Sequence, residues 1–270
     1  LVLHACLVPG RPASSATPKF VGEPKSGNDV PESRYIAVDQ FGYRPDMKKV
    51  AILVDPQQGW NADDEYVPGE TLELRRFDDA AQVTSGKPVL WNNGLTQSSA
   101  GDRGFWFDFS AVTEPGSYFV FDRQNGVRSA RFEIQKDVYR NVLKAAVRMF
   151  YFNRANFAKV KPFACVGEKC WLQGVDYMGP GQDSEARSVL DRENEKTARD
   201  LSGGWWGAGG TDKKTTINYA PRHQLLSAYE QNPRPFTDDY GIPESGNGLP
   251  DLIDEIKVEH DFLKKMQPSD

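Results

Sequence analysis

Short apolar runs separated by turn-forming residues dominate the chain between residues 35 and 135. Residues 71–77 alternate apolar and polar positions, as in a strand with one buried face. Five further runs have the same β-like character: 35–39, 49–54, 105–109, 116–121 and 129–134. Clusters of Pro, Gly, Asn and Asp lie between them. Short strands at this density, with no helical stretch, predict a β-sandwich of immunoglobulin-like shape over residues 35–135.

The apolar period lengthens to three or four residues over 136–270, which predicts a helical region. Helices are expected from residue 138 to about 156, over 222–230, and from Pro250 onward. Pro250 suits a first helical position, and acids follow it in the first turn. The first helix is predicted to bury Val138, Val142, Ala145, Ala146, Met149, Phe150 and Asn153. The last is predicted to bury Leu252, Ile253, Ile256, Leu263 and Met266.

Residues 1–34 have the composition of a leader remnant and an unstructured linker. Residues 1–8 are apolar, like the tail of an export segment, and 9–25 are rich in Pro, Ser, Ala and Gly. The string Leu3-His4-Ala5-Cys6 also resembles a lipoprotein cleavage box. We therefore expect an exported protein, secreted or periplasmic, with a lipid anchor as a further alternative. A terminus that carries no address is the other interpretation.

Composition excludes several classes of protein. Hydrophobic residues make up 39% and charged residues 26%, which is ordinary for a globular chain. The net charge of −5 argues against nucleic-acid binding, which requires a basic face. No apolar run is long enough for a membrane span. The 6 Trp, 10 Tyr and 15 Phe can build a core or line a sugar-binding cleft, and composition does not choose between these uses.

Candidate metal and cysteine sites are few. Cys165 and Cys170 can form a local disulfide or remain thiols, and further zinc ligands are not evident nearby. His223 and His260 lie on predicted helices, where packing or surface roles are expected. Four acids could bind a cation, or serve as loop charges and helix caps: Asp238, Asp239, Glu244 and Asp251. No cofactor is expected to be required, and a structural calcium or zinc ion is left undecided.

Two loop-like stretches, 200–213 and 236–251, attract attention as places for chemistry. The first is rich in glycine, but its spacing does not match a phosphate-binding loop, because Gly204 and Gly209 are followed by Gly210 and Lys213 comes too late. The chain also lacks the G-x-S-x-G pattern of a serine nucleophile. Neither nucleotide binding nor a serine-hydrolase mechanism is therefore expected.

Three strings resemble those of glycoside hydrolase family 9. They are VDQFGY at 38–43, GPGQDSEAR at 179–187 and IPESGNG at 242–248, supported by Asp251, Asp254, Glu255 and Lys257. The family comprises inverting cellulases and related β-1,4-glucan hydrolases, here in the branch with an N-terminal immunoglobulin-like domain. The resemblance implies an (α/α)₆ barrel, with a cleft for a β-glucan chain or cello-oligosaccharide.

The chain departs from the family pattern at two positions. The family's loop reads Asp-Ala-Gly-Asp, in which the second aspartate is the general base and the first helps to hold the attacking water. Gly207 and Gly210 stand at these positions, so no intact catalytic residue is identified. Asp212 lies two residues beyond Gly210. The sequence does not decide whether its carboxylate contacts the attacking water.

The second departure is length. The family's general acid is a glutamate downstream of everything present here, and the 134 residues from Asp137 to Asp270 are too few for twelve helices. We therefore expect 136–270 to be the N-terminal portion of the hydrolase domain. The expected function is an inactive or incomplete β-glucan hydrolase. The alternative is a non-catalytic module, either structural or carbohydrate-binding, with Trp205, Trp206, Tyr177 and Trp171 as sugar contacts.

Overall fold

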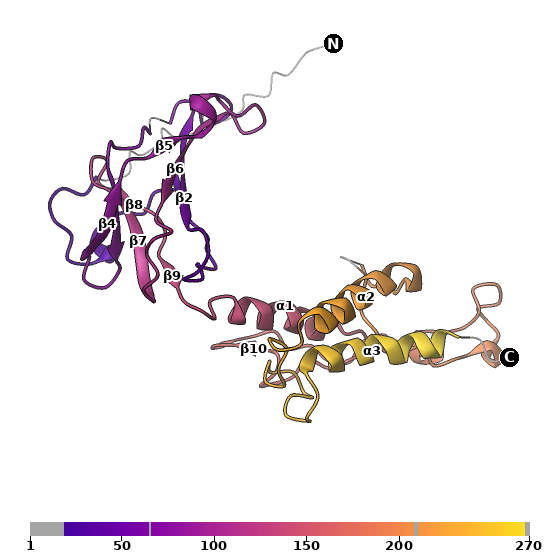
Figure 1. Cartoon of the computed structure of the whole chain (residues 1–270). Helices are drawn as coiled ribbons and strands as arrows, with labels where there is room; N and C mark the ends of the chain where they lie inside the picture. Colours follow the sequence, from indigo (N-terminus) through magenta and orange to yellow (C-terminus); the bar gives the residue numbers. More distant parts are fainter. Residues whose placement is uncertain (1–18, 65, 208–209, 268–270) are drawn as a thin grey trace, which may run out of the picture. The chain divides into compact units, whose positions relative to one another are not determined.

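The chain forms two compact units, Leu1–Tyr139 and Arg140–Asp270, each with its own secondary structure (Figure 1). The computed structural model describes residues 19–64, 66–207 and 210–267. Residues 1–18 of the expected leader and linker, including Cys6, lie outside the described residues. Residues 19–34 were also expected to be unstructured, but Val30 is 2% exposed and packs with Phe119 of the sandwich. The two units are described separately below.

The first unit contains two antiparallel sheets. One has the strand order β1-β2-β6-β5, and the other has β4-β3-β7-β8 with β9 also paired to β7. The strands are β1 (Ile36–Ala37), β2 (Val50–Pro56), β3 (Leu72–Arg76), β4 (Gln82–Gly86), β5 (Val89–Leu90), β6 (Asp102–Asp108), β7 (Gly116–Asp122), β8 (Val127–Arg128) and β9 (Phe132–Ile134). Two 3₁₀ turns accompany them, η1 (Gly27–Asp29) and η2 (Trp91–Gly94).

A large core joins the inner faces of these sheets, and a second, smaller cluster that includes Phe119 and Phe121 lies in the same unit. Leu53 and Phe107 contribute from the first sheet, and Leu74, Val120 and Phe132 from the second. Alternating residues thus close a β-sandwich, as the period of two predicts. All six predicted strands are confirmed. The short strands β4, β5 and β8 were not predicted, because two-residue pairings and a polar edge strand carry too little apolar pattern.

The described part of the second unit contains three α-helices joined by long connections, and Figure 1 shows their arrangement within the unit. They are α1 (Arg140–Asn153), α2 (Thr215–Gln231) and α3 (Asp251–Met266). A hairpin of β10 (Cys165–Val166) and β11 (Lys169–Cys170) and the 3₁₀ turns η3 (Asp183–Glu185) and η4 (Glu195–Thr197) lie between α1 and α2. A disulfide joins Cys165 to Cys170 across the hairpin. None of the described helices is both long and apolar enough to cross a membrane.

The predicted buried face of α1 is wrong. Val147 and Tyr151 are buried, whereas Met149 is 58% exposed. Leu143, Val147 and Tyr151 recur every four residues, and Val142, Ala145 and Met149 form a second apolar row. Periodicity cannot choose between two apolar rows on one helix. The row that packs is set by α3, whose Leu252 and Ile256 share a cluster with Val147.

The predicted start of α2 at Arg222 is also wrong, because the helix begins at Thr215 and continues through Pro221. The segment before Pro221 contains β-branched Thr215, Thr216 and Ile217, which are weak helix formers. The prediction for α3 is confirmed, with Leu252 and Ile256 buried. Pro250 is its N-cap residue rather than its first helical residue.

Candidate functional site

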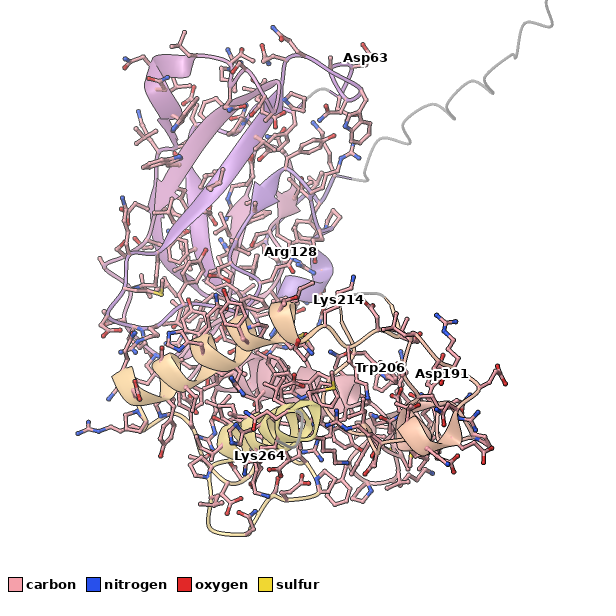
Figure 2. All side chains as sticks on the ribbon, turned by 90° about the vertical axis from the view of Figure 1, so that its right-hand side faces the viewer. Asp63, Arg128, Asp191, Trp206, Lys214 and Lys264 are labelled. Atoms are coloured by element: carbon pink, nitrogen blue, oxygen red, sulfur yellow. A yellow bond between two sulfur atoms is a disulfide. The ribbon has the colours of Figure 1, made fainter. Side chains whose placement is uncertain are left out.

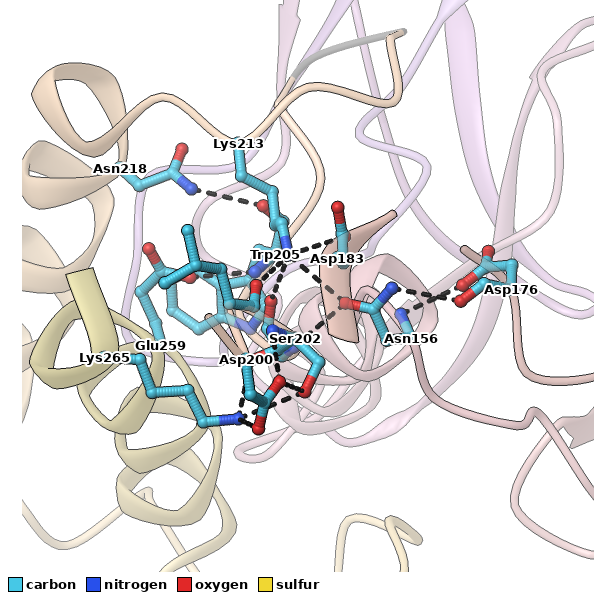
Figure 3. Close-up of polar contacts among 12 residues, drawn as sticks. Asn156, Asp176, Asp183, Asp200, Ser202, Trp205, Lys213, Asn218, Glu259 and Lys265 are labelled. Atoms are coloured by element: carbon cyan, nitrogen blue, oxygen red, sulfur yellow. Dashed lines mark hydrogen bonds and ion pairs between the residues drawn. The ribbon is translucent and has the colours of Figure 1, made fainter. Parts of the chain in front are cut away.

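The loop that carries the glycine pair begins at a firmly anchored tryptophan. Trp205 is 2% exposed, and its ring packs on Phe150 with centroids 4.6 Å apart. Its backbone N–H donates to Glu259 Oε2 at 2.8 Å, and Asn218 Nδ2 donates to its carbonyl at 3.2 Å (Figure 3). Helices α1, α2 and α3 therefore all fix this residue. Trp205 is thus part of the interior, and its burial argues against a sugar contact.

Gly204 is required where the loop approaches α3. Its φ of +75° lies in the left-handed region, and a Cβ there would lie 2.7 Å from the ring of Phe262. A side chain would force the loop away from the helix. This glycine therefore allows Trp205 N to reach Glu259.

Lys213 fastens the other side of the loop from within. Its side chain is 8% exposed, and its ammonium donates to the carbonyls of Leu201 and Gly203 at 2.7 and 3.2 Å. It also donates to Asn156 Oδ1 at 3.2 Å and pairs with Asp183 at 2.7 Å (Figure 3). A lysine buried with this many acceptors is a structural cation. Its position after the glycines is the one sequence signal of this role.

Trp206, the next residue after Trp205, has a fixed backbone and a half-buried side chain. It exchanges two hydrogen bonds with Asn153: its N–H donates to the Asn153 carbonyl at 3.0 Å, and Asn153 Nδ2 donates to its carbonyl at 2.7 Å. Its ring meets that of Tyr177 edge to face at 5.3 Å. Tyr177 is 42% exposed and has a φ of +50°. Strained non-glycine residues of this kind cluster at functional sites.

Gly207 follows Trp206 directly, and Gly210 lies three residues further along the chain. Gly207 N–H donates to the Asp212 carbonyl at 2.7 Å, and Gly210 N–H donates to the Gly207 carbonyl at 3.0 Å. Neither glycine has a φ in the left-handed region, so φ does not exclude an L-residue, although a Cβ at 207 would lie 3.1 Å from the Asp212 carbonyl oxygen. Neither position offers a proton-accepting side chain.

Asp212 supplies the nearest carboxylate to both glycines. An ideal Cβ at residue 210 would lie 2.7 Å from Asp212 Oδ1, and one at residue 207 would lie 3.7 Å from it. Asp212 Oδ2 pairs with Lys214 at 2.9 Å (Figure 2 labels Lys214 and Trp206). The hydrogen bond from Lys214 lowers the pKa of Asp212 below its ordinary value. Asp212 is therefore a charged hydrogen-bond acceptor at neutral pH and a weak base.

A buried ion-pair network supports the floor of the site. Arg154, 1% exposed, pairs with Glu244 at 2.8 Å and with Glu255 at 2.9 Å. Burial raises the pKa of Glu255 to about 7, and burial also raises the pKa of Glu259. The sequence analysis did not identify this network. Its signal is the i, i+4 spacing of Asp251, Glu255 and Glu259, which places acids on the inner face of α3.

One group of acids has the donor chemistry of a hard-cation site. Oxygens of Asp238, Asp251 and Asp254 lie within 4.8 Å of one another. Carboxylate oxygens are the ligands that calcium prefers. Asp251 also caps the turn before α3, because its Oδ2 accepts from Tyr240 N and Ser245 Oγ.

The other residues singled out from the sequence lie in ion pairs, in ring contacts or at the surface of this chain. Asp239 pairs with Lys144 at 2.8 Å, and Glu244 belongs to the Arg154 network. His223 and His260 line a shallow surface depression between α2 and α3. Trp171 is 55% exposed and packs edge to face on Phe152.

Comparison with known families matches both units. Residues 32–126 match the model described as the cellulase N-terminal ig-like domain. Residues 139–270 match glycosyl hydrolase family 9. The two matched ranges correspond to the β-sandwich and to the helical unit.

The relatives are named as β-glucan-degrading enzymes. A cellulose 1,4-beta-cellobiosidase of Acetivibrio thermocellus is 28% identical over 86% of this chain and 27% of its own. A cellodextrinase of Butyrivibrio fibrisolvens is 32% identical over 64% of this chain and 29% of its own. The chain thus spans less than a third of the length of these curated relatives.

A solved structure gives the same assignment. A metagenome-derived glycoside hydrolase family 9 endoglucanase superposes with a TM-score of 0.69 at 31% identity, over 87% of this chain and 41% of its own. A Bacteroides ovatus GH9 structure has a TM-score of 0.71 at 24% identity and supports the fold. The chain belongs to glycosyl hydrolase family 9, with a cellulase-type immunoglobulin-like domain ahead of the hydrolase domain.

Proposed function

We propose that this chain binds β-1,4-glucan at the Trp206 loop and does not hydrolyse it. The observation that carries the proposal is the pair Gly207 and Gly210, placed on a loop whose anchors are all present. The names of the relatives support cellulose-type polysaccharide or cello-oligosaccharide as the ligand class.

The absence of hydrolysis follows from the requirements of inversion. An inverting glycosidase uses one carboxylate to deprotonate water and a second, about 6.5–9.5 Å away, to protonate the leaving oxygen. The resemblance assigns the water to the carboxylates at 207 and 210, and glycine cannot accept a proton. Asp212 stands at neither position, and Lys214 lowers its pKa, which makes it a weaker base.

Binding is assigned to the aromatic pair of half-buried Trp206 and exposed Tyr177. Pyranose rings present apolar C–H faces, and Trp and Tyr present large flat surfaces with little entropy to lose. The Trp206 and Tyr177 rings are held in a fixed relation by their edge-to-face contact and by the two backbone hydrogen bonds to Asn153. A rigid platform lowers the entropic cost of holding a sugar.

The remaining features fit the same proposal. The helices α1, α2 and α3 would belong to the (α/α)₆ barrel of the family, with the β-sandwich as a non-catalytic brace. Export fits a polymeric substrate and the Cys165–Cys170 disulfide, because such bonds persist in oxidising compartments.

Calorimetry with cellotetraose tests the binding proposal. The wild-type chain should release or absorb heat with a saturable isotherm at millimolar ligand or below, and Trp206→Ala should weaken binding at least tenfold. Trp106→Ala is the matched control, since Trp106 is 42% exposed on the β-sandwich, away from the loop in sequence and in its own unit. An absence of heat for the wild-type chain at millimolar ligand would overturn the proposal.

A further inference from the structure

The carboxylate of Asp212 occupies the space in which the side chain of residue 210 would lie. Its Oδ1 is 2.7 Å from the ideal Cβ position of residue 210. The carboxylate oxygens of an aspartate lie two bonds from its own Cβ, at a comparable distance. Asp212 Oδ1 therefore lies about as far from this Cβ position as the carboxylate oxygens of an aspartate at 210 would.

The closed backbone of the turn produces this placement. The hydrogen bond from Gly207 N to the Asp212 carbonyl, at 2.7 Å, brings the end of the turn back to its beginning. A second hydrogen bond joins Gly210 N to the Gly207 carbonyl. Asp212 therefore follows Trp206 closely in space, although five residues separate Trp206 from Asp212 along the chain.

The two oxygens of Asp212 have different surroundings. Oδ2 pairs with Lys214, whereas among the described residues no other side chain donates to Oδ1. The side chain is 49% exposed, so the carboxylate is accessible from solvent. A carboxylate that is held by a cation through one oxygen can accept a further hydrogen bond, and sugar hydroxyls are donors of the right kind.

We propose that Asp212 is the carboxylate of the glucan-binding site, accepting a hydroxyl hydrogen bond through Oδ1 in the place that Gly210 leaves open. This assignment rests on the proposed function, because it requires that glucan binds at the Trp206 loop. The role is recognition: the hydroxyl proton stays on the sugar, and no bond is broken. Asp212 would determine affinity for a polyhydroxylated ring over an apolar ring of the same size.

The test measures cellotetraose affinity by calorimetry for the wild type, Asp212→Ala and Asp212→Asn. A charge-assisted hydrogen bond at an accessible site predicts binding about tenfold weaker for Asp212→Ala, and a smaller loss for Asp212→Asn, which keeps an acceptor but no charge. Asp46→Asn is the matched control, because Asp46 forms a surface ion pair with Arg44, also two residues away, in the β-sandwich unit. Its affinity should equal that of the wild type.

A pH series adds a readout that a structural role would not move. Binding should weaken as Asp212 is protonated at acidic pH, and Lys214→Met should move that transition to higher pH, because Lys214 lowers the pKa of Asp212. If Asp212→Ala binds within twofold of the wild type while Trp206→Ala loses binding, the assignment of Asp212 fails and the proposed function stands. If the wild type does not bind, both fail.

Discussion

The two ends of the segment from Trp205 to Asp212 are built in different ways. At its start, Trp205 is buried and is held by Glu259 and Asn218. At its end, Gly210 carries no side chain and Asp212 is half-exposed beside a surface lysine. The first end is fixed by contacts with three helices, and the second has no side chain at positions 207 and 210. The scaffold of a site and its chemistry are thus specified by separate residues, and one can be present without the other.

Removing the buried cation of the scaffold should have the largest effect. Arg154→Leu leaves Glu255 buried, with its ion-pair partner gone. Breaking a buried pair on one side costs about 3–5 kcal/mol, enough to unfold a marginal unit. Urea denaturation followed by Trp fluorescence would measure the loss. A change below 1 kcal/mol would show that the network does not support the loop.

The same network predicts a dependence of stability on pH. The pKa of Glu255 rises from 4.5 in the unfolded chain to about 7 in the folded one. The native state therefore holds a proton that the unfolded state releases, so stability is full below pH 4.5 and falls as the pH rises through about 7, by about 3 kcal/mol at most. Urea midpoints between pH 4.5 and 7.5 would show the slope. Glu255→Gln should flatten it, and an unchanged slope in that variant would assign it to other groups.

Lys213 and Lys214 are adjacent, but one is buried under the loop and the other lies on the surface. Replacing each in turn compares the two ends of the segment from Trp205 to Asp212. Lys213→Met removes several hydrogen bonds and the ion pair with Asp183, and should cost about 2 kcal/mol. Lys214→Met breaks only a surface pair and should cost less than about 0.5 kcal/mol. Thermal melts of the two variants under one buffer would compare them. Equal losses would contradict the distinction between the two ends.

The smallest effect on stability is expected for a substitution at Gly210. The φ of residue 210 allows Gly210→Asp, and the nearest atom to the new Cβ would be the carboxylate oxygen Oδ1 of Asp212, at 2.7 Å. The displaced side chain and the new like-charge pair should cost less than about 1 kcal/mol, and Gly210→Asp/Asp212→Asn should recover most of that loss. Melting temperatures of the wild type, the single variant and the double variant would measure these losses. A loss of several kcal/mol would mean that the turn is not built to accept a side chain.

The sequence predicts the fold of the first unit better than that of the second. Alternation along residues 71–77 and the turn residues between runs are local signals, so the major strands follow from them. On α1, two apolar rows compete, and only the partner helix decides that Val147 and Tyr151 are buried. The start of α2 before Pro221 was missed because β-branched residues there weaken the helical signal.

The candidate site divides in a similar way. Gly207 and Gly210 are visible in the sequence as substitutions within a family string, because a missing carboxylate needs no structure to be noticed. The roles of Lys213 and Arg154 are not visible, because they depend on carbonyls and carboxylates up to 101 residues apart. The same limit applies to Trp205 and Trp206, which are neighbours in sequence but differ in burial, since only the packing of three helices separates them.

Product analysis after incubation with cellotetraose tests the central claim most directly. The purified chain, at a concentration where calorimetry shows the sugar bound, would be held with cellotetraose for a day and the sugars separated by chromatography. The account predicts intact cellotetraose, at the level of a buffer blank, because no carboxylate is present at 207 or 210 to deprotonate water. Cellobiose released in proportion to the amount of protein would contradict it.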